Sequence, residues 1–241
     1  MSAAVELSGL EVKAGRKTLL GPVDLSIAAG EHVLVVGRSG SGKTTLLRAI
    51  AGLVRPARGR VLLGGREASE GGRLALPPEQ RRIGYLFQGG ALWPHMSVKR
   101  TLAFTLARAG VGRSRRKARI AELLALVELE GFEKRMPGTL SGGEAQRLAL
   151  ARALAVEPEI VLLDEPLGPL DAELRGALLE RLGSLQKELS WTALHVTHDP
   201  AEAASVATRV LRIEEGRIHE QPAEETPSMH QTEIAPTEIA P

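Results

Sequence analysis

The sequence contains no cysteine, and this absence removes several kinds of chemistry at once. Without thiols the chain forms no disulfide, offers no thiolate nucleophile and builds no zinc–thiolate site. Aromatic residues are also scarce, since phenylalanine, tyrosine and tryptophan together make up 2% of the 241 residues. Because 43% of the residues are hydrophobic, the core must be built mainly from leucine, valine and alanine.

Long apolar runs and an excess of one charge are absent as well. No apolar run approaches the roughly 18 residues of a membrane-spanning helix, and the first residues lack the pattern of a secretory signal. The formal net charge is +2, which gives no reason to expect a nucleic-acid partner. We therefore expect a cytoplasmic protein that reaches a membrane only through a partner. Its length predicts one compact domain with an inserted lobe.

A glycine-rich segment is the most informative feature that is present, because it matches the phosphate-binding pattern G-x-x-x-x-G-K-[ST]. An apolar run at 33–36 before it predicts a buried strand, and the run at 45–50 after it predicts a helix that ends near Gly52. This arrangement aims backbone N–H groups and the positive end of a helix at one point. Lys43 can then reach the β- and γ-phosphates, and the Thr44 hydroxyl can bind Mg²⁺. The predicted nucleotide-binding residues are Gly37, Arg38, Ser39, Gly40, Ser41, Gly42, Lys43, Thr44 and Thr45.

Two carboxylates follow the apolar run Ile160–Leu163. Such a run predicts a strand buried on both faces of a parallel sheet, and ligands bind at the carboxyl ends of these strands. We expect Asp164 to hold Mg²⁺ through a water molecule and Glu165 to orient or deprotonate the attacking water. In isolation the same two residues could equally be surface acids at a strand end.

Ser141, Gly142 and Gly143 precede a helical run at 148–154 and form a second predicted anion site. Because one phosphate loop already surrounds the phosphates of one nucleotide, we expect two chains to meet head to tail, each closing the nucleotide of the other. A structural interpretation is that Ser141 caps the helix, with Glu144 at the capping-box position. Both interpretations can hold, because capping leaves other N–H groups free.

Two weaker motifs add polar side chains. His198 follows the apolar run 193–196, and an imidazole at a strand end could contact the γ-phosphate and position water. A lone histidine is more often structural. Gln88 follows the run 83–87, and its carbonyl and amide suit a metal ion and a water at once. The predicted catalytic residues are Glu165, His198, Gln88 and Lys43, and the predicted metal ligands are Thr44, Gln88 and Asp164.

Taken in their order along the chain, the motifs resemble those of the ATP-binding cassette (ABC) ATPases, the energy-coupling subunits of ABC transporters. The resemblance covers about residues 5–222 and includes a loop at Asp171. It implies an α/β fold in which a P-loop NTPase (RecA-like) core carries an N-terminal antiparallel β-subdomain and an inserted helical subdomain at about 89–156. It also implies ATP and Mg²⁺ as cofactors and a head-to-tail homodimer. The further partners it implies are an integral-membrane permease, which holds the protein on the cytoplasmic face of the membrane, and a substrate-binding protein acting through that permease.

Within the family, the stretches 91–98 and 163–171 look most like importer cassettes for inorganic anions, polyamines, iron or sugars. Two departures stand out. Arg100-Thr101 replaces the usual Glu-Asn near the expected permease contact, and Gly168-Pro169 replaces the usual Ser-Ala beside Asp171.

A third departure concerns the nucleotide base. The family usually stacks an aromatic residue on adenine, and that position falls on Ala14 in a stretch, 1–84, that contains no aromatic residue. Arg16 or Lys13 could substitute by cation stacking.

Three other functions remain open. An export, lipid-extraction or cell-division cassette would use the same chemistry. A nucleotide switch acting on ribosomes or DNA fits less well, because the chain holds one copy of the motifs and only 51 residues between Gln88 and Leu140. A binding module that has lost hydrolysis is disfavoured, since every predicted catalytic residue is present.

Coarse patterning predicts strands over 5–36 and a loop-rich stretch over Arg55–Arg82 with one short strand at Arg60–Leu63. Residues 158–218 alternate between strand and helix patterns. A basic run that begins at Gly112 predicts a helix start with a solvated face. The polar tail at 223–241 repeats Thr-Glu-Ile-Ala-Pro and is expected to be disordered.

Overall fold

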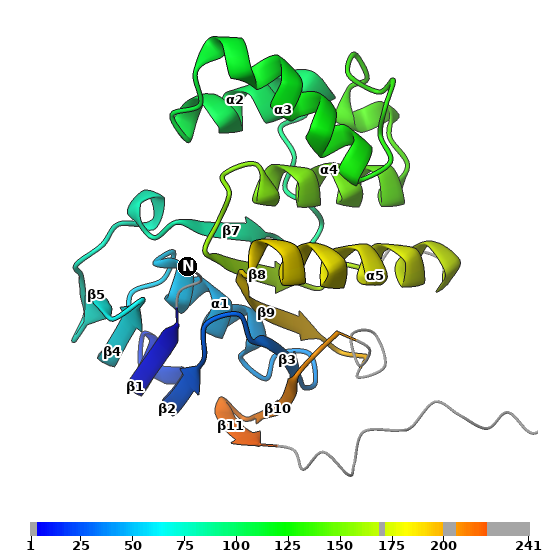
Figure 1. Ribbon diagram of the computed structural model, residues 1–241. Coiled ribbons are helices and arrows are strands. Elements are labelled where there is room, and N and C mark those ends of the chain that lie inside the picture. Colours follow the sequence, from blue (N-terminus) through cyan, green and yellow to red (C-terminus); the bar gives the residue numbers. More distant parts are fainter. Residues whose placement is uncertain (1–3, 169–171, 200–205, 221–241) are drawn as a thin grey trace, which may run out of the picture.

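Two β-sheets and a layer of helices make up the computed structural model, which describes residues 4–168, 172–199 and 206–220 (Figure 1). The antiparallel sheet contains, in spatial order, β2 (Lys17–Ile27), β1 (Val5–Ala14), β4 (Arg58–Leu63), β5 (Arg66–Glu70) and β6 (Arg73–Leu74). The larger sheet contains β11 (Arg217–Glu220), β10 (Arg209–Glu214), β3 (His32–Val36), β9 (Thr192–Thr197), β8 (Ile160–Asp164) and β7 (Ile83–Leu86).

The central strands of the larger sheet are parallel and completely buried. β3 pairs in parallel with β9 and β10, β9 pairs with β8, and β8 pairs with β7. Every residue of β3, β8 and β9 is buried, as expected for strands that are covered on both faces. The apolar runs that predicted these strands are therefore confirmed.

The two faces of this sheet belong to two different cores. Val33 and Val35 pack toward α1 (Lys43–Ala51) and the antiparallel sheet. Leu34 and Val36, which alternate with them along β3, pack into a cluster formed by the other helices. The helix α5 (Ala172–Leu189) contributes to this second cluster.

Three helices lie between β7 and β8 in the chain, namely α2 (Val98–Arg108), α3 (Arg113–Leu126) and α4 (Gly142–Leu154). Figure 1 shows α2 and α3 at the top of the molecule, with α4 between them and the sheet. Residues 87–159 are all described and contain no strand, only these helices and a short 3₁₀ turn, Pro137–Thr139. α3 begins directly after Gly112 as predicted. The lobe boundaries of about 89 and 156 remain a prediction.

The stretch Arg55–Arg82 is more ordered than its loop-rich pattern predicted, because it contains β5 and β6 in addition to β4. A buried arginine accounts for part of this order. Arg81 is 3% exposed, and burial lowers its pKa to about 10. Its guanidinium ties this stretch to the end of α1 by donating to the carbonyl oxygens of Ala49, Ile50, Ala68 and Leu76 and to the hydroxyl of Ser69.

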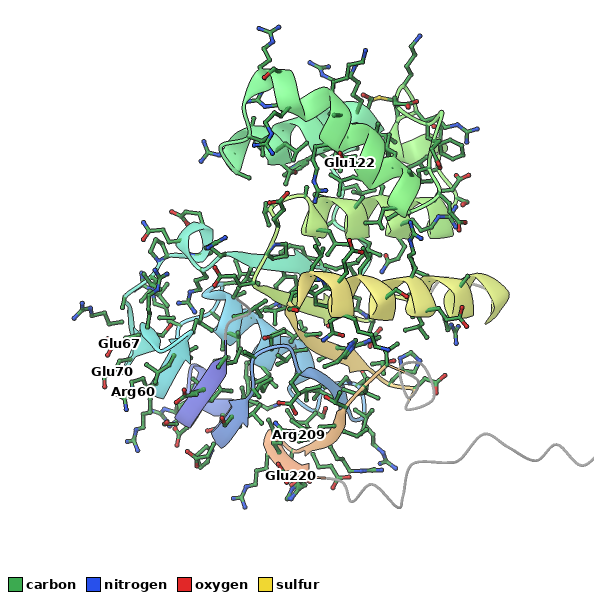
Figure 2. The ribbon with its side chains drawn as sticks, in the orientation of Figure 1. Arg60, Glu67, Glu70, Glu122, Arg209 and Glu220 are labelled. Atoms are coloured by element: carbon green, nitrogen blue, oxygen red, sulfur yellow. The ribbon has the colours of Figure 1, made fainter. Side chains whose placement is uncertain are left out.

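Charged side chains lie on the antiparallel sheet and at the β10–β11 edge of the larger sheet (Figure 2). Arg60 of β4 is in register with Glu70 of β5, which places opposite charges side by side on neighbouring strands. Arg209 and Glu220 form a similar pair across β10 and β11, with their charged atoms 4.0 Å apart.

Two expectations fall outside the described residues, namely the Asp171 loop with Pro169 and the disordered tail at 223–241. Within the described ranges, no helix combines the length and the apolar character that crossing a membrane requires.

Two histidines are buried next to each other in the larger sheet. His32 begins β3 and His195 lies in β9, with ring centroids 5.8 Å apart. Nδ1 of His32 lies 2.8 Å from Oε1 of Gln186 on α5. Burial lowers the pKa of both rings, and the neighbouring His32 helps to bring that of His195 to about 3. The folded protein therefore keeps both rings neutral at neutral pH.

We expect this pair to make the free energy of unfolding depend on pH. An unfolded histidine takes up a proton near pH 6.5, whereas folded His195 does so only near pH 3. Stability is thus fully present above about pH 6.5 and decreases at lower pH, by about 2 kcal/mol at pH 5 from His195 alone. Urea unfolding at pH 7.5 and pH 5 measures this loss.

The variant His195→Leu should lose less stability between these two pH values than the parent. The matched control is His219→Gln, which removes an exposed histidine and should keep the parent's pH dependence. An unchanged loss in His195→Leu would show that the buried ring does not carry the effect.

Candidate active site

Four of the predicted motifs lie at the carboxyl ends of the adjacent strands β3, β9, β8 and β7. In the parallel pairing, Val36 of β3 is opposite Thr197 of β9, and Val196 is opposite Asp164 of β8. The segments that follow these strands therefore emerge at one edge of the sheet. This edge is where open α/β sheets bind ligands.

The glycine-rich loop after β3 needs glycine for two different reasons. A Cβ on Gly37 would collide with the carbonyl oxygen of Ile213 and lie 2.8 Å from the Ser41 hydroxyl. Gly42 has φ 112°, a conformation that other residues rarely adopt. α1 begins directly after Gly42 without an acidic residue in its first turn, and among the described side chains none caps it. Its N-terminal N–H groups thus remain available to an anion.

Lys43 is held across this loop by its own backbone. The buried ammonium donates to the carbonyl oxygens of Gly37 at 2.6 Å and Arg38 at 3.0 Å, which uses two of its three N–H donors. Burial lowers the pKa of Lys43, and the charges of Glu165 and Asp164 oppose that shift. A bound phosphate would add the negative charge that this buried cation favours.

Asp164 is held between a hydroxyl and a phenol. Thr44 Oγ1 donates to Oδ1 of Asp164 at 2.9 Å, and the hydroxyl of Tyr85 donates to Oδ2 at 3.2 Å. Burial raises the pKa of Asp164, while these two hydrogen bonds and the charge of Arg48 lower it and Glu165 raises it further.

The oxygens of Thr44 and Asp164 fit a magnesium ion. Mg²⁺ takes hard oxygen ligands and usually keeps several waters, so a hydroxyl could bind it directly and a carboxylate through a water. Thr44 Oγ1 and Asp164 Oδ1 lie 2.9 Å apart and are joined by a hydrogen bond. Both atoms lie next to the phosphate loop, where a phosphate oxygen could complete the coordination.

Glu165 stands in a strained conformation that several contacts maintain. Its φ of 49° lies in the left-handed region, which costs a residue with a side chain about 1–3 kcal/mol. Its N–H donates to the carbonyl oxygen of Val196 at 2.9 Å. Gln146 of α4 donates to the carbonyl oxygens of Glu165 at 3.4 Å and Pro166 at 2.6 Å.

The carboxylate of Glu165 lies beside two other predicted catalytic residues. Nε2 of Gln88 donates to Oε2 at 2.9 Å, and Nδ1 of His198 lies 3.7 Å from Oε1. His198 is largely exposed, with 65% of its side chain accessible. A carboxylate, an amide and an imidazole thus surround a point that solvent can reach.

A cavity of about 560 Å³ connects the loop with Gln88 and Glu165, whereas His198 is not part of its lining. Most predicted nucleotide-binding residues line it, together with Gln88 and Glu165. The predicted residues in its lining are Ser39, Gly40, Gly42, Lys43, Thr44, Thr45, Gln88 and Glu165. Gly37 and Arg38 contribute from the loop as acceptors for Lys43.

The second predicted anion site is not part of this cavity. The lining does not include Ser141, Gly142 or Gly143. Ser141 and Gly142 are exposed at the start of α4, and the predicted capping box is confirmed. Ser141 N donates to the carboxylate of Glu144 at 2.7 Å, and Glu144 N donates to Ser141 Oγ at 3.2 Å. Within one chain, the two predicted phosphate sites therefore do not meet.

Sequence reasoning missed several residues at this site. Tyr85 gave only a weak signal, namely its place near the end of a strand before Gln88. Gln146 was a polar residue within an otherwise helical run and received no role. The turn at Glu215-Gly216 lines the cavity because Gly216 N donates to the carbonyl oxygen of Ser41 at 3.0 Å, a contact that no local pattern indicates.

The structure also shows where the position expected to contact adenine lies relative to the cavity. Ala14 is exposed at the end of β1 and is in register with Lys17, the first residue of β2. Lys17 lines the cavity together with Thr18 and Leu19, whereas Ala14 does not. The cavity therefore contains a cation and no aromatic ring on this side.

Curated relatives cover most of this chain. It is 42% identical over 214 residues to the Fe(3+) ions import ATP-binding protein FbpC of Escherichia coli (strain K12), which covers 89% of the chain and 60% of the relative. It is 48% identical over 198 residues to the sulfate/thiosulfate import ATP-binding protein CysA of Thermosynechococcus vestitus (strain NIES-2133 / IAM M-273 / BP-1), which covers 82% of the chain and 57% of the relative. The chain thus spans less than two thirds of the length of these relatives.

A solved structure and a family model agree with these matches. The fold is similar to a dimeric structure of a post-hydrolysis state of the ATP-binding cassette MJ0796 bound to ADP and Pi, with a TM-score of 0.79 and 32% identity. The match covers 90% of this chain and 98% of that chain, and it confirms the cassette fold that the motifs predicted. The family model described as ABC transporter matches residues 20–168. The chain therefore belongs to the ABC transporter family and has the fold of its ATP-binding cassettes.

Proposed function

We propose that this protein is the ATP-hydrolysing subunit of an ABC transporter, and that it powers import through a partner permease at the cytoplasmic face of the membrane. The observation that carries the proposal is the contact of Gln88 and His198 with the Glu165 carboxylate beside the phosphate loop. A site built only to bind nucleotide has no need of a carboxylate that accepts from an amide on one oxygen and has an imidazole near the other.

In the proposed mechanism, each part of the site has one task. The N-terminus of α1 and Lys43 bind the β- and γ-phosphates. Thr44, Asp164 and Gln88 would hold Mg²⁺, which neutralises charge on the phosphate oxygens when it is bound. Glu165 orients or deprotonates the attacking water, and His198 helps to place it. Catalysis is thus positioning and electrostatic stabilisation.

The position of Ser141 supports a head-to-tail dimer. Its helix terminus lies outside the cavity of its own chain, so the nucleotide it serves would be bound to a second copy. The similar cassette MJ0796 is described as dimeric with ADP and Pi. A difference in the affinity of the closed dimer for ATP and for ADP would then supply the conformational switch.

A second cavity, of about 820 Å³, is a proposed contact for the permease. It lies between the sheet and the helical layer, with residues of β7, α2 and α4 in its wall. Phe104 of α2 is 43% exposed and meets Trp93 edge to face at 5.3 Å. An apolar segment of a partner would bury both rings. A substrate-binding protein would act through the permease, and the relatives named for iron and sulfate import suggest solutes of that kind.

The first test of this function replaces the proposed base. Glu165→Gln keeps the size of the side chain and removes its charge, so we expect ATP binding to persist while turnover decreases by about 10²–10⁴. An ATP-bound dimer should accumulate, and gel filtration with ATP detects it. Lys43→Ala should instead weaken ATP binding. Hydrolysis by Glu165→Gln at the parent rate would contradict the mechanism.

The contact with the nucleotide base gives a second test. With a cation and no aromatic ring beside the cavity, ATP and GTP should bind with similar affinity. Ala14→Tyr should tighten ATP binding by up to about 1–3 kcal/mol, the usual worth of a stacked base. Ala14→Leu is the matched control, because it adds bulk without a π-face. Both variants are titrated with fluorescent ATP. Equal ATP affinity in the two variants would show that Ala14 does not face the nucleotide base.

The shared site gives a third test. Ser141→Arg should bind ATP normally as a monomer but fail to dimerise and hydrolyse. Mixing it with Lys43→Ala forms heterodimers in which one site pairs an intact loop with an intact Ser141 helix. If the sites work independently, some ATPase activity should return on mixing.

A crosslink separates the outcomes of that mixing experiment. Ser141→Cys in one chain and Ser39→Cys in the other should crosslink when ATP is bound, and the chain has no other cysteine to interfere. No rescue together with a crosslink would mean that both sites must act together. No crosslink would mean that Ser141 does not serve the opposite chain.

A further inference from the structure

We infer that Tyr85 is a positioning residue for the metal site, because its hydroxyl fixes the orientation of the Asp164 carboxylate. The inference rests on the proposed role of Asp164 as a magnesium ligand. It adds a residue that neither the motifs nor the proposed mechanism includes.

The strand register places the phenol beside the carboxylate. Tyr85 in β7 is in parallel register with Leu162 of β8, two residues before Asp164. Its hydroxyl donates to Oδ2 of Asp164 at 3.2 Å, while Thr44 Oγ1 lies 2.9 Å from Oδ1. The two carboxylate oxygens therefore have different partners, and Oδ1 is the one that faces the phosphate loop through Thr44.

This division of partners has a chemical consequence. A carboxylate without hydrogen-bond partners can rotate, so that its two oxygens exchange positions. In Asp164, the donor on Oδ2 and the hydroxyl at Oδ1 restrain this rotation. The phenol of tyrosine normally ionises near pH 10, so it acts as a neutral donor at physiological pH. Removing a hydrogen bond that orients a metal ligand typically costs 10–100-fold in metal affinity.

The aromatic ring of Tyr85 is itself held in place. It stacks on Phe87 with centroids 4.2 Å apart and an interplanar angle of 27°. Both residues line the cavity of about 820 Å³. Tyr85 thus contacts Asp164 with its hydroxyl and also borders this cavity. Whatever displaces the Phe87–Tyr85 stack would also disturb Asp164.

The hydrogen bond could instead serve only to join β7 and β8, and metal affinity separates the two roles. Tyr85→Phe keeps the ring, its stacking and the cavity wall, and it removes only the hydroxyl. A structural role would lower the melting temperature and leave metal binding unchanged. A positioning role lowers metal affinity and leaves the affinity for nucleotide without metal unchanged.

The experiment measures Mn²⁺ binding by electron paramagnetic resonance on the full chain with a non-hydrolysable ATP analogue. We expect Tyr85→Phe to bind Mn²⁺ at least tenfold more weakly than the parent, with unchanged affinity for the analogue in EDTA. A Mn²⁺ affinity within twofold of the parent would overturn the inference. Asp164→Asn serves as the reference variant, and unchanged Mn²⁺ binding in it would overturn the metal assignment and the inference together.

A spectroscopic test needs no substitution at Tyr85. The chain has one tyrosine, so labelling with ¹³Cζ-tyrosine gives a single NMR signal from this phenol. We expect the signal to shift when Mg²⁺ is added to the complex with the ATP analogue, and to stay in place when the analogue is added in EDTA. A signal that does not respond to Mg²⁺ would mean that the phenol does not sense the metal ligand, and would overturn the inference even if Tyr85→Phe fails to fold.

Discussion

The parallel pairing of β3 with β9, and of β9 with β8, is the constraint on which the site depends. The pairing aligns Val36 with Thr197 and Val196 with Asp164, so the segments that follow all three strands begin at one edge. These strands are buried on both faces, because helices cover one face and α1 with the antiparallel sheet covers the other. Charged chemistry is therefore confined to the strand ends, where water and a nucleotide can reach it.

Lys43 and Asp164 are both buried at this edge, so their charged forms are unfavourable when no ligand is bound. Burial raises the pKa of Asp164 and lowers that of Lys43, so each charged form is disfavoured by its surroundings. Glu165 also has a left-handed backbone conformation, which hydrogen bonds with Val196 and Gln146 maintain. Buried charges and a strained backbone, each of which is unfavourable for stability, thus occur together at this site. Such combinations are expected where a protein binds a ligand or catalyses a reaction. A phosphate beside Lys43 and a cation beside Asp164 would relieve both disfavoured charges.

The helix α4 links features that lie far apart in the site. Its first turn carries the exposed Ser141 cap, and five residues later Gln146 holds the backbone of Glu165 and Pro166. Near its other end, Arg152 donates to the carbonyl oxygens of Gly90 at 2.9 Å and Ala91 at 2.6 Å, in the segment that follows Gln88. One rigid element thus contacts the proposed dimer face, the proposed base and the wall of the second cavity.

The sequence by itself determined the parts of this protein that depend on local chemistry. The phosphate loop needs glycine at Gly37 and Gly42, α1 starts where the glycines end, and Ser141 with Glu144 closes a capping box within one helical turn. The buried strands were predictable because parallel strands require unbroken apolar runs. Only the tertiary structure decided that Tyr85 meets Asp164, that β5 and β6 form around Arg81, and that the turn at Gly216 closes the cavity against Ser41. These contacts join residues between 13 and 175 positions apart, and they depend on strand order and register, which no local periodicity encodes.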